Sequence, residues 1–227
     1  MKQLIFDMNQ DIKDIAFPTH LLKERSEIIE ICLNTCRYVN SIQPIAAVKP
    51  QIGQIALIVD YMSRIFFFTE EKYYSIALPI QIEVIKKNNF KFKHTDTYIT
   101  SEYWTWLIAL HKNGKEILEN DINFLDFLFN CESNNFDFYS LYDMFKETDY
   151  GYIRYDIDPT AYKDALKKGK VHSHPLNHFD IHLSNHSTFK TGLITQISPT
   201  EFIEYLDNGM DRWYSTEFKN LKRLPKS

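Results

Sequence analysis

Two short segments in the last third of the chain alternate between polar and apolar residues, and this alternation limits the fold more than any other feature. Side chains of a β-strand point alternately to its two faces, so each segment is predicted to be a strand with one buried face. In the first strand, residues 151–157, Arg154 and Asp156 share the polar face. In the second strand, residues 178–183, the polar face consists of His178, Asp180 and His182.

Pairing of these two strands would place Arg154 and Asp156 beside the polar row of the second strand. A helix is the alternative for the second segment, because histidines recur every four residues from position 174 to position 186. Pro175 would interrupt that helix, and the apolar residues at positions 179, 181 and 183 would scatter around its axis. We therefore favour two strands.

Histidine is concentrated around these strands, since five of the eight histidines lie between positions 150 and 206. A neutral imidazole can bind a divalent metal ion, and its pKa near neutrality also suits proton transfer. An arginine beside it can clamp a phosphate. The predicted catalytic residues are His178, His182, Asp180, Arg154 and Asp156. The predicted ligands of a divalent metal ion are His172, His174, His178 and His182. The competing explanation is a solvated sheet face on which the histidines only hydrogen-bond to backbone and carboxylates.

Other sequence motifs for catalysis or nucleotide binding are missing or incomplete. The chain has only 6 glycines, and it contains neither GxGxxG nor GxxxxGK[ST], nor the GxSxG of a serine nucleophile. His182-Leu183-Ser184 matches one half of the motif of two-histidine phosphoesterases, and no second half is present. The histidine-rich segment therefore remains the only candidate site.

The first 147 residues are predicted to be mainly helical, because their apolar residues recur at helical spacing. Ser101 is predicted to cap one of these helices. Residues 52–68 fit either a buried helix or a helix that runs into a strand, and residues 90–94 alternate like a strand. The predicted helices cover residues 2–15, 21–39, 102–118 and two short segments separated at residues 133–135.

The predicted fold class is α+β, with a helical N-terminal part packed on a small, mainly antiparallel sheet and closed by C-terminal helices. The chain is predicted to be a single domain, 1–227, with a soft division near residue 148. Residues 1–147 would be mainly helical, and 148–227 would hold the histidine-bearing strands plus the C-terminal helices. Ser198, followed by Pro199 and Glu201, predicts the start of one such helix, and residues 213–221 predict another.

The net charge and the cysteine content indicate which classes of function and which cellular location the chain fits. The net charge of −4 does not support strong nonspecific binding of nucleic acid, which requires a basic face. Three cysteines, an odd and low number, and the polar N-terminus predict a reducing, cytoplasmic location. The most apolar run, residues 52–68, is interrupted by polar residues and falls short of the roughly 20 apolar residues of a membrane span. No membrane association is expected.

Residues 150–206 also resemble a bacterial family known only as a domain of unknown function, the one numbered twenty-two ninety. The resemblance is carried by three segments in the same order, which read R-Y-D-x-D-P from Arg154, H-P-x-x-H-x-x-I-H from His174 and P-x-x-F-I from Pro199. The family has an Arg-Ile-Pro segment before the last helix, where this chain has Thr191-Gly192-Leu193-Ile194-Thr195. The resemblance implies an intracellular bacterial protein of a phage-defence or toxin–antitoxin type system, and it supplies no reaction.

Two functions of different classes follow from these observations. The first is an enzyme that acts on a phosphoester or a nucleic acid through the histidine-rich strand. The second is a non-enzymatic interaction subunit that binds a protein partner through the aromatic-rich segment 124–145, although such aromatic residues more often form a core.

Overall fold

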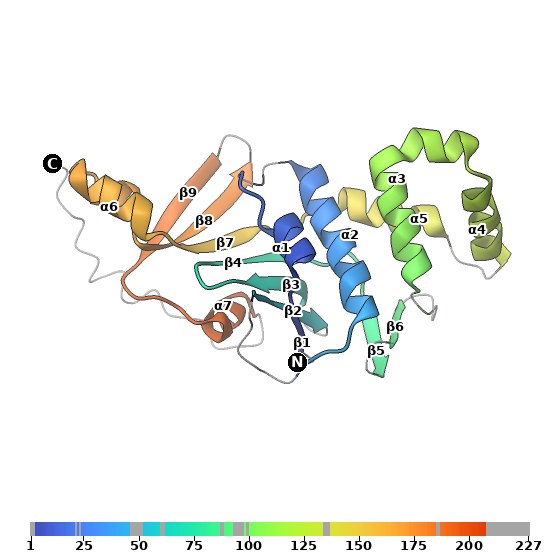
Figure 1. Ribbon diagram of the computed structural model, residues 1–227, viewed down its shortest axis with the longest axis horizontal. Coiled ribbons are helices and arrows are strands. Elements are labelled where there is room, and N and C mark those ends of the chain that lie inside the picture. The colour runs from blue at the N-terminus through green and yellow to red at the C-terminus, as the bar shows by residue number, and fades with distance from the viewer. Residues whose placement is uncertain are drawn as a thin grey trace. The chain divides into compact units, whose positions relative to one another are not determined.

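The computed structural model describes residues 3–20, 22, 24–45, 52–59, 62–86, 89–92, 98, 100–133, 137–184 and 187–207. Within these residues the chain forms helices and antiparallel strands, which confirms the predicted α+β class (Figure 1). The chain divides into two compact units. The first contains residues 1–67 and 76–151, and the second contains residues 68–75 and 152–227.

The first unit contains most of the helices together with short antiparallel strands. Strand β1 pairs with β2, from Gln3 opposite Ile58 to Asp7 opposite Gln54, and β5 pairs with β6 in a separate two-stranded sheet. Its strands are β1 (Gln3–Asp7), β2 (Gln54–Val59), β3 (Ser63–Phe68, whose last residue belongs to the second unit), β5 (Ile82–Lys86) and β6 (Asn89–Phe92). Its helices are α1 (Gln10–Ala16), α2 (Arg25–Ser41), α3 (Ser101–Asn120), α4 (Ile122–Ser133) and α5 (Phe138–Glu147).

Two predictions for the first unit are wrong in the type of element. Residues 2–15 do not form one helix, because Asn9 caps a new helix by accepting the Ile12 N–H at 2.9 Å, and the chain before it is strand β1. The run 52–68 contains no helix among its described residues, and it forms β2 and β3 instead. Both strands are rich in Ile and Phe, and they are buried along most of their length. A short, fully buried strand therefore shows no alternation that distinguishes it from a helix.

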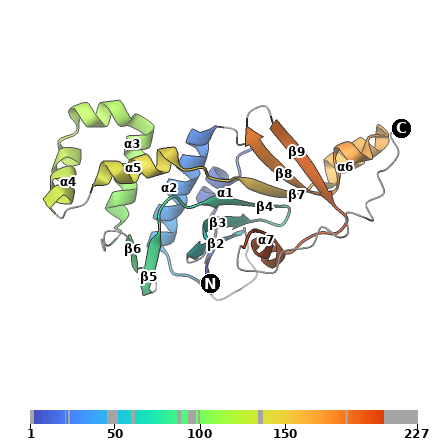
Figure 2. The ribbon, with the colours of Figure 1, turned by 180° about the vertical axis from the view of Figure 1, so that it is seen from behind.

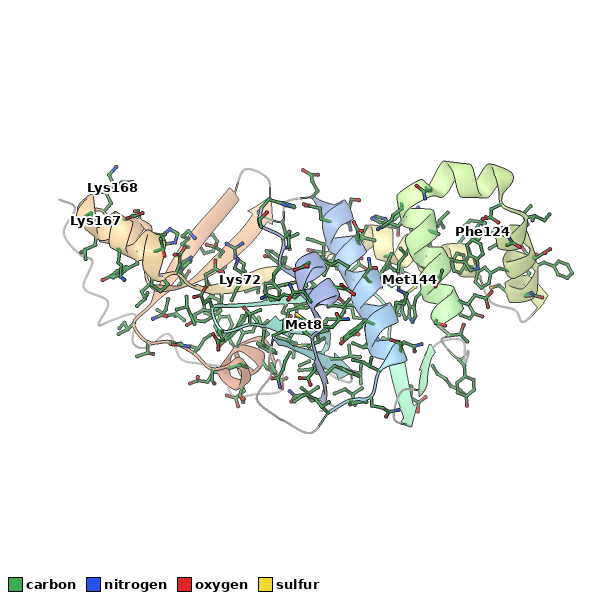
Figure 3. All side chains as sticks on the ribbon, in the orientation of Figure 1. Met8, Lys72, Phe124, Met144, Lys167 and Lys168 are labelled. Atoms are coloured by element: carbon green, nitrogen blue, oxygen red, sulfur yellow. The ribbon has the colours of Figure 1, made fainter. Side chains whose placement is uncertain are left out.

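The predictions for the later helices are confirmed. The helix predicted at 102–118 is α3, and its backbone leaves helical geometry at Asn113 (φ −132°, ψ 30°), beside the helix-weakening Gly114. The aromatic segment forms the two predicted helices, α4 and α5. Phe124 is fully buried, and its ring contacts Trp106, Phe127 and Phe138 (Figure 3). The aromatic residues of this segment therefore supply a core as well as a surface.

The second unit is built on strands β4, β7, β8 and β9, which lie in this order and pair antiparallel where the register is defined. Figure 2 shows β7, β8 and β9 side by side, with α6 following β7 directly. The elements of this unit are β4 (Lys72–Ala77, whose last two residues belong to the first unit), β7 (Ile153–Ile157), α6 (Pro159–Lys167), a 3₁₀ turn (Val171–Ser173), β8 (Asn177–Ser184), β9 (Ser187–Leu193) and α7 (Pro199–Leu206).

An aromatic core covers the apolar face of this sheet. Tyr155 of β7 and Phe179 of β8 are buried there, as their alternation predicts, and Phe202 of α7 packs between Phe179 and Tyr73. Helix α7 begins as predicted, because Ser198 accepts the backbone N–H of the third helical residue and that residue's carboxylate accepts the Ser198 N–H.

The helix predicted at residues 213–221 lies outside the described residues. Among the described residues, no helix combines the length and the apolar character needed to cross a lipid bilayer.

Candidate functional site

The polar face of strands β7 and β8 forms the candidate site. The two strands pair as expected, so their polar rows lie side by side, and the register places Arg154 opposite Asp180 and Asp156 opposite His178. Strand β9 adds Lys190 opposite Asp180. These five residues are called the strand cluster below. All of them belong to the second unit, so the sheet itself holds the cluster together.

Arg154 connects the two carboxylates of the strand cluster. Its Nη2 atom lies 2.8 Å from Asp156 Oδ2, and it also donates to Asp180 Oδ2. The side chains of Arg154 and Asp156 are each 11% exposed, so this ion pair is largely removed from water. Burial opposes the charge of Arg154, but Asp156, Tyr152 and Asp180 outweigh it and raise the pKa of the guanidinium above its ordinary value. Arg154 therefore remains a fixed positive charge between the two strands.

His178 is completely buried, and its hydrogen bonds fix which ring nitrogen carries the proton. Nδ1 lies 2.8 Å from the carbonyl oxygen of Pro175, which can only accept, so Nδ1 must be protonated. Nε2 accepts a hydrogen bond from Lys190 Nζ at 2.8 Å, so it carries a lone pair. Burial and the charge of Lys190 lower the pKa of His178 below its ordinary value, in spite of the carboxylates nearby. The imidazole is therefore neutral, and its lone pair faces the cluster.

The close approach of Gly192 and Pro175 positions this imidazole. Gly192 of β9 lies opposite His178, and a Cβ atom at Gly192 would come within 2.7 Å of the Pro175 ring. Only glycine therefore allows the loop before β8 to pack this closely against β9. The contact holds the Pro175 carbonyl that binds His178 Nδ1.

The two carboxylates of the cluster differ in their surroundings. Burial raises the pKa of Asp156 above its ordinary value, although Arg154 and Lys72 act against it. Burial acts in the same direction on Asp180, but the hydrogen bond from Lys190 at 2.6 Å and the charge of Arg154 outweigh it and lower the pKa of Asp180. Asp156 Oδ1 is buried and has no hydrogen-bond donor among the described residues. A buried acceptor without a donor is costly in free energy, so Asp156 is incompletely satisfied.

Three groups of the cluster could together hold a metal ion. One ligand atom each from Asp156, His178 and Asp180 lies within 4.8 Å of the other two. His178 Nε2 is 3.8 Å from Asp156 Oδ2 and 3.8 Å from Asp180 Oδ1. The structure thus shows a triad whose geometry is compatible with a metal ion. Of the four histidines predicted as metal ligands, only His178 belongs to this triad.

The other predicted histidines are not part of this triad. His172 is exposed on the 3₁₀ turn. His174 Nε2 lies 3.2 Å from Asp158 Oδ2, and its ring stands edge-on to His178 at 4.8 Å between centroids. The backbone of His182 lies in β8 opposite Thr188, and its side chain lies outside the described residues. His174 thus borders the cluster, whereas His172 lies apart from it.

Sequence reasoning missed two basic residues near the carboxylates. Lys190 lies in the segment 187–193, where apolar alternation is weak because Phe189 is half exposed and position 192 is glycine. Lys72 lies opposite Asp156 on β4, about 80 positions earlier in the chain (Figure 3). Ser and Asn are residue types that favour turns, so the sequence at positions 184–185 was the available signal for a third strand.

A scan against protein-family models finds no match to this chain, and searches of curated proteins and of solved structures find none either. The resemblance to the domain of unknown function therefore stays a prediction. The candidate function rests on the geometry of the strand cluster.

Proposed function

We propose that the protein is a phosphoester hydrolase whose active site is the strand cluster of Arg154, Asp156, His178, Asp180 and Lys190. The observation that carries the proposal is the neutral, buried imidazole of His178, whose Nε2 atom accepts a hydrogen bond from Lys190 and lies 3.8 Å from an oxygen of each of two carboxylates. Perturbed titratable groups that converge in this way are typical of active sites. The bacterial defence or toxin–antitoxin setting is part of the same proposal, and it is supported by the sequence resemblance alone.

The charges around the cluster favour an anionic substrate. Arg154, Lys190 and Lys72 supply three positive charges beside the two carboxylates Asp156 and Asp180. Four exposed lysines lie on α6 and just after it, at positions 163, 167, 168 and 170, against a single acidic residue at position 164. Figure 3 labels Lys167 and Lys168 at the end of α6. The chain as a whole is acidic, but this part of the second unit is basic. A phosphodiester backbone is therefore a suitable substrate class.

The chemistry that the cluster supports is the addition of water across a P–O bond. The oxygen of water forms a bond to phosphorus, the bond to the leaving oxygen breaks, and that oxygen gains a proton. His178 Nε2 provides the lone pair that this step requires, either for the proton of water or for a cation that binds the water. Arg154 and Lys190 stabilise the negative charge on the phosphoryl oxygens.

Replacement of His178 by asparagine tests the proposal. The asparagine amide can still donate to the Pro175 carbonyl from the position of Nδ1, but it has no lone pair at the position of Nε2. We expect hydrolysis of bis(p-nitrophenyl) phosphate and of single-stranded nucleic acid to fall by about 10²–10⁴-fold, the usual contribution of a positioned acid–base group. His172→Asn is the matched control, because His172 is exposed outside the cluster, and it should retain full activity.

Circular dichroism and thermal unfolding of His178→Asn would show whether the variant keeps its fold. Asp180→Asn gives a second variant, which removes charge from a partly exposed side chain. The proposal would be contradicted if the wild-type protein hydrolysed none of the phosphoesters tested. It would also be contradicted if wild type and both variants were equally active.

A second function is favoured by the exposed face of α4. Ile122, Leu125 and Phe129 are 67%, 51% and 69% exposed, and their spacing places them on one stripe of the helix. Asp126 and Glu132 flank this stripe. An apolar stripe with acidic borders suits a partner protein that presents a basic, amphipathic segment. We propose that such a partner binds α4.

Introduction of positive charge into the apolar stripe of α4 tests this second function. Leu125→Arg with Phe129→Arg should abolish co-purification of the partner, because arginine would repel its basic segment and remove the apolar contact. Leu166→Arg on α6 is the matched control, since Leu166 is also half exposed, at 54%, and should leave binding unchanged. Affinity purification followed by mass spectrometry measures the result. If the partner co-purified equally with wild type, with the double variant and with Leu166→Arg, binding at α4 would be contradicted.

A further inference from the structure

We infer that Asp156, His178 and Asp180 bind a single divalent transition-metal ion, and that the ammonium group of Lys190 occupies the position of this ion when it is absent. The inference rests on the proposed function for its catalytic meaning, because it assigns the His178 lone pair to a cation rather than to a proton. Metal binding itself is measured without any activity.

The separations within the triad suit metal coordination. His178 Nε2 lies 3.8 Å from an oxygen of each carboxylate. Two ligands bound to one tetrahedral ion at about 2.1 Å each lie about 3.4 Å apart, so each pair would have to close by only about 0.4 Å to share an ion. The three ligand atoms lie within 4.8 Å of one another, and small side-chain rotations would close the remaining gap.

The protonation of His178 also suits a ligand. Its Nδ1 donates to the Pro175 carbonyl, and this bond directs the Nε2 lone pair toward the two carboxylates. In metalloproteins the second ring nitrogen of a ligating histidine is held by a carbonyl or a carboxylate in the same way. The close packing of Gly192 against Pro175 keeps this support in place.

Asp156 supplies an independent observation. The residue is only 7% exposed, and its Oδ1 atom is buried without a donor among the described residues. Arg154 satisfies Oδ2 at 2.8 Å and leaves Oδ1 open. A carboxylate buried in this state lacks a partner at Oδ1, and a cation bound by both oxygens of Asp156 would provide it.

Lys190 marks the position of the ion. Its Nζ atom lies 2.6 Å from Asp180 Oδ1 and 2.8 Å from His178 Nε2, so one positive charge already contacts two of the three ligands. Lys190 comes from β9, and its side chain is 32% exposed, so it can swing into solvent when a metal ion enters. Lys190 therefore competes with the metal ion for His178 and Asp180. Once the ion has displaced it, its ammonium group can contact a phosphate.

The donor set indicates the type of ion. One imidazole nitrogen and two carboxylate oxygens suit Mn²⁺ or Zn²⁺, whereas Ca²⁺ and Mg²⁺ prefer oxygen ligands alone. Three protein ligands also leave coordination positions for water and substrate, as in catalytic rather than structural metal sites.

Titration of the full-length, metal-free protein with Mn²⁺, followed by electron paramagnetic resonance, tests the inference. Wild type should bind one Mn²⁺ per chain, and His178→Asn and Asp156→Asn should lose this binding. Lys190→Met should bind Mn²⁺ about tenfold more tightly than wild type, because no ammonium has to be displaced. Lys167→Met is the matched control, since Lys167 pairs with Asp164 on α6 away from the cluster, and it should match wild type.

Three outcomes separate this inference from the proposed function. Failure of both wild type and Lys190→Met to bind Mn²⁺ or Zn²⁺, or undiminished binding by His178→Asn, would overturn the metal site. Phosphoester hydrolysis that persists in EDTA would also overturn it, while the proposed function stands. Stoichiometric binding that is lost in His178→Asn, in a protein without hydrolytic activity, would support the metal site and refute the proposed function.

Discussion

Replacement of Arg154 by methionine is expected to lower the free energy of unfolding by about 3–5 kcal/mol, the usual cost of removing one partner from a buried ion pair. Methionine fills a similar volume, so the loss reflects charge rather than a cavity. Without Arg154, the buried Asp156 carboxylate loses its ion-pair partner at 2.8 Å, and Asp180 keeps Lys190 as its one cationic partner among the described residues. Chemical denaturation monitored by fluorescence measures the change.

Two further variants identify the origin of this loss. Arg154→Lys keeps the charge but replaces the guanidinium, one nitrogen of which contacts both carboxylates, by a more strongly hydrated ammonium, so its stability should lie between those of wild type and Arg154→Met. Adding Asp156→Asn to Arg154→Met removes the uncompensated charge and should restore part of the stability. If the double variant were less stable than Arg154→Met by the full effect of Asp156→Asn alone, the two residues would not be coupled.

Replacement of Phe202 by alanine is expected to cost a similar amount, about 3–5 kcal/mol, because it leaves a large cavity in the core of the second unit. Phe202 is completely buried, and its ring contacts Tyr73, Phe68 and Phe179. These contacts hold α7 on the apolar face of the strands whose other face carries the cluster. Denaturant unfolding of wild type and variant measures this change in the free energy of unfolding.

Tyr205→Ala on the same helix is the matched control. Tyr205 also stacks on Phe179, at 4.8 Å between ring centroids, but it is 47% exposed. Its loss should cost only about 1 kcal/mol, the scale of one aromatic pair. If Phe202→Ala and Tyr205→Ala lowered the free energy of unfolding equally, burial would not decide how much each ring contributes to stability.

The arrangement of the site was predictable from the sequence where alternation was strict. The polar residues of 151–157 and 178–183 predicted both strands, and their pairing predicted that Arg154 and Asp156 lie beside the polar row of the second strand, because side chains on one face of paired strands are neighbours. Lys190 was not predictable in the same way. The segment around it has an exposed Phe189 and a glycine at 192, so its two faces differ little in polarity. The glycine is explained only by the Pro175 ring that packs on it.

The first unit was harder to predict for a different reason. The apolar residues Leu4, Ile5 and Met8 fit one helical stripe, yet the first two lie in strand β1 and pair with β2 across about 50 residues. Local spacing cannot report such a distant partner, and the partner decides the element. Asn9 caps α1 and marks the break, but that cap was not predicted, and neither was the cap of α5 at Asp137, whereas Ser198 correctly predicted the start of α7.

The position of β4 in the chain has a consequence for synthesis of the protein. Tyr74 pairs with Arg154, so the ribosome adds a further 80 residues after the first partner before the second exists. At about 5–20 residues per second, this edge of β4 waits roughly 4–16 seconds for β7. An unpaired strand edge is a template for wrong pairing during such an interval. The nascent chain must therefore be most vulnerable to aggregation before the residues of the cluster have been translated.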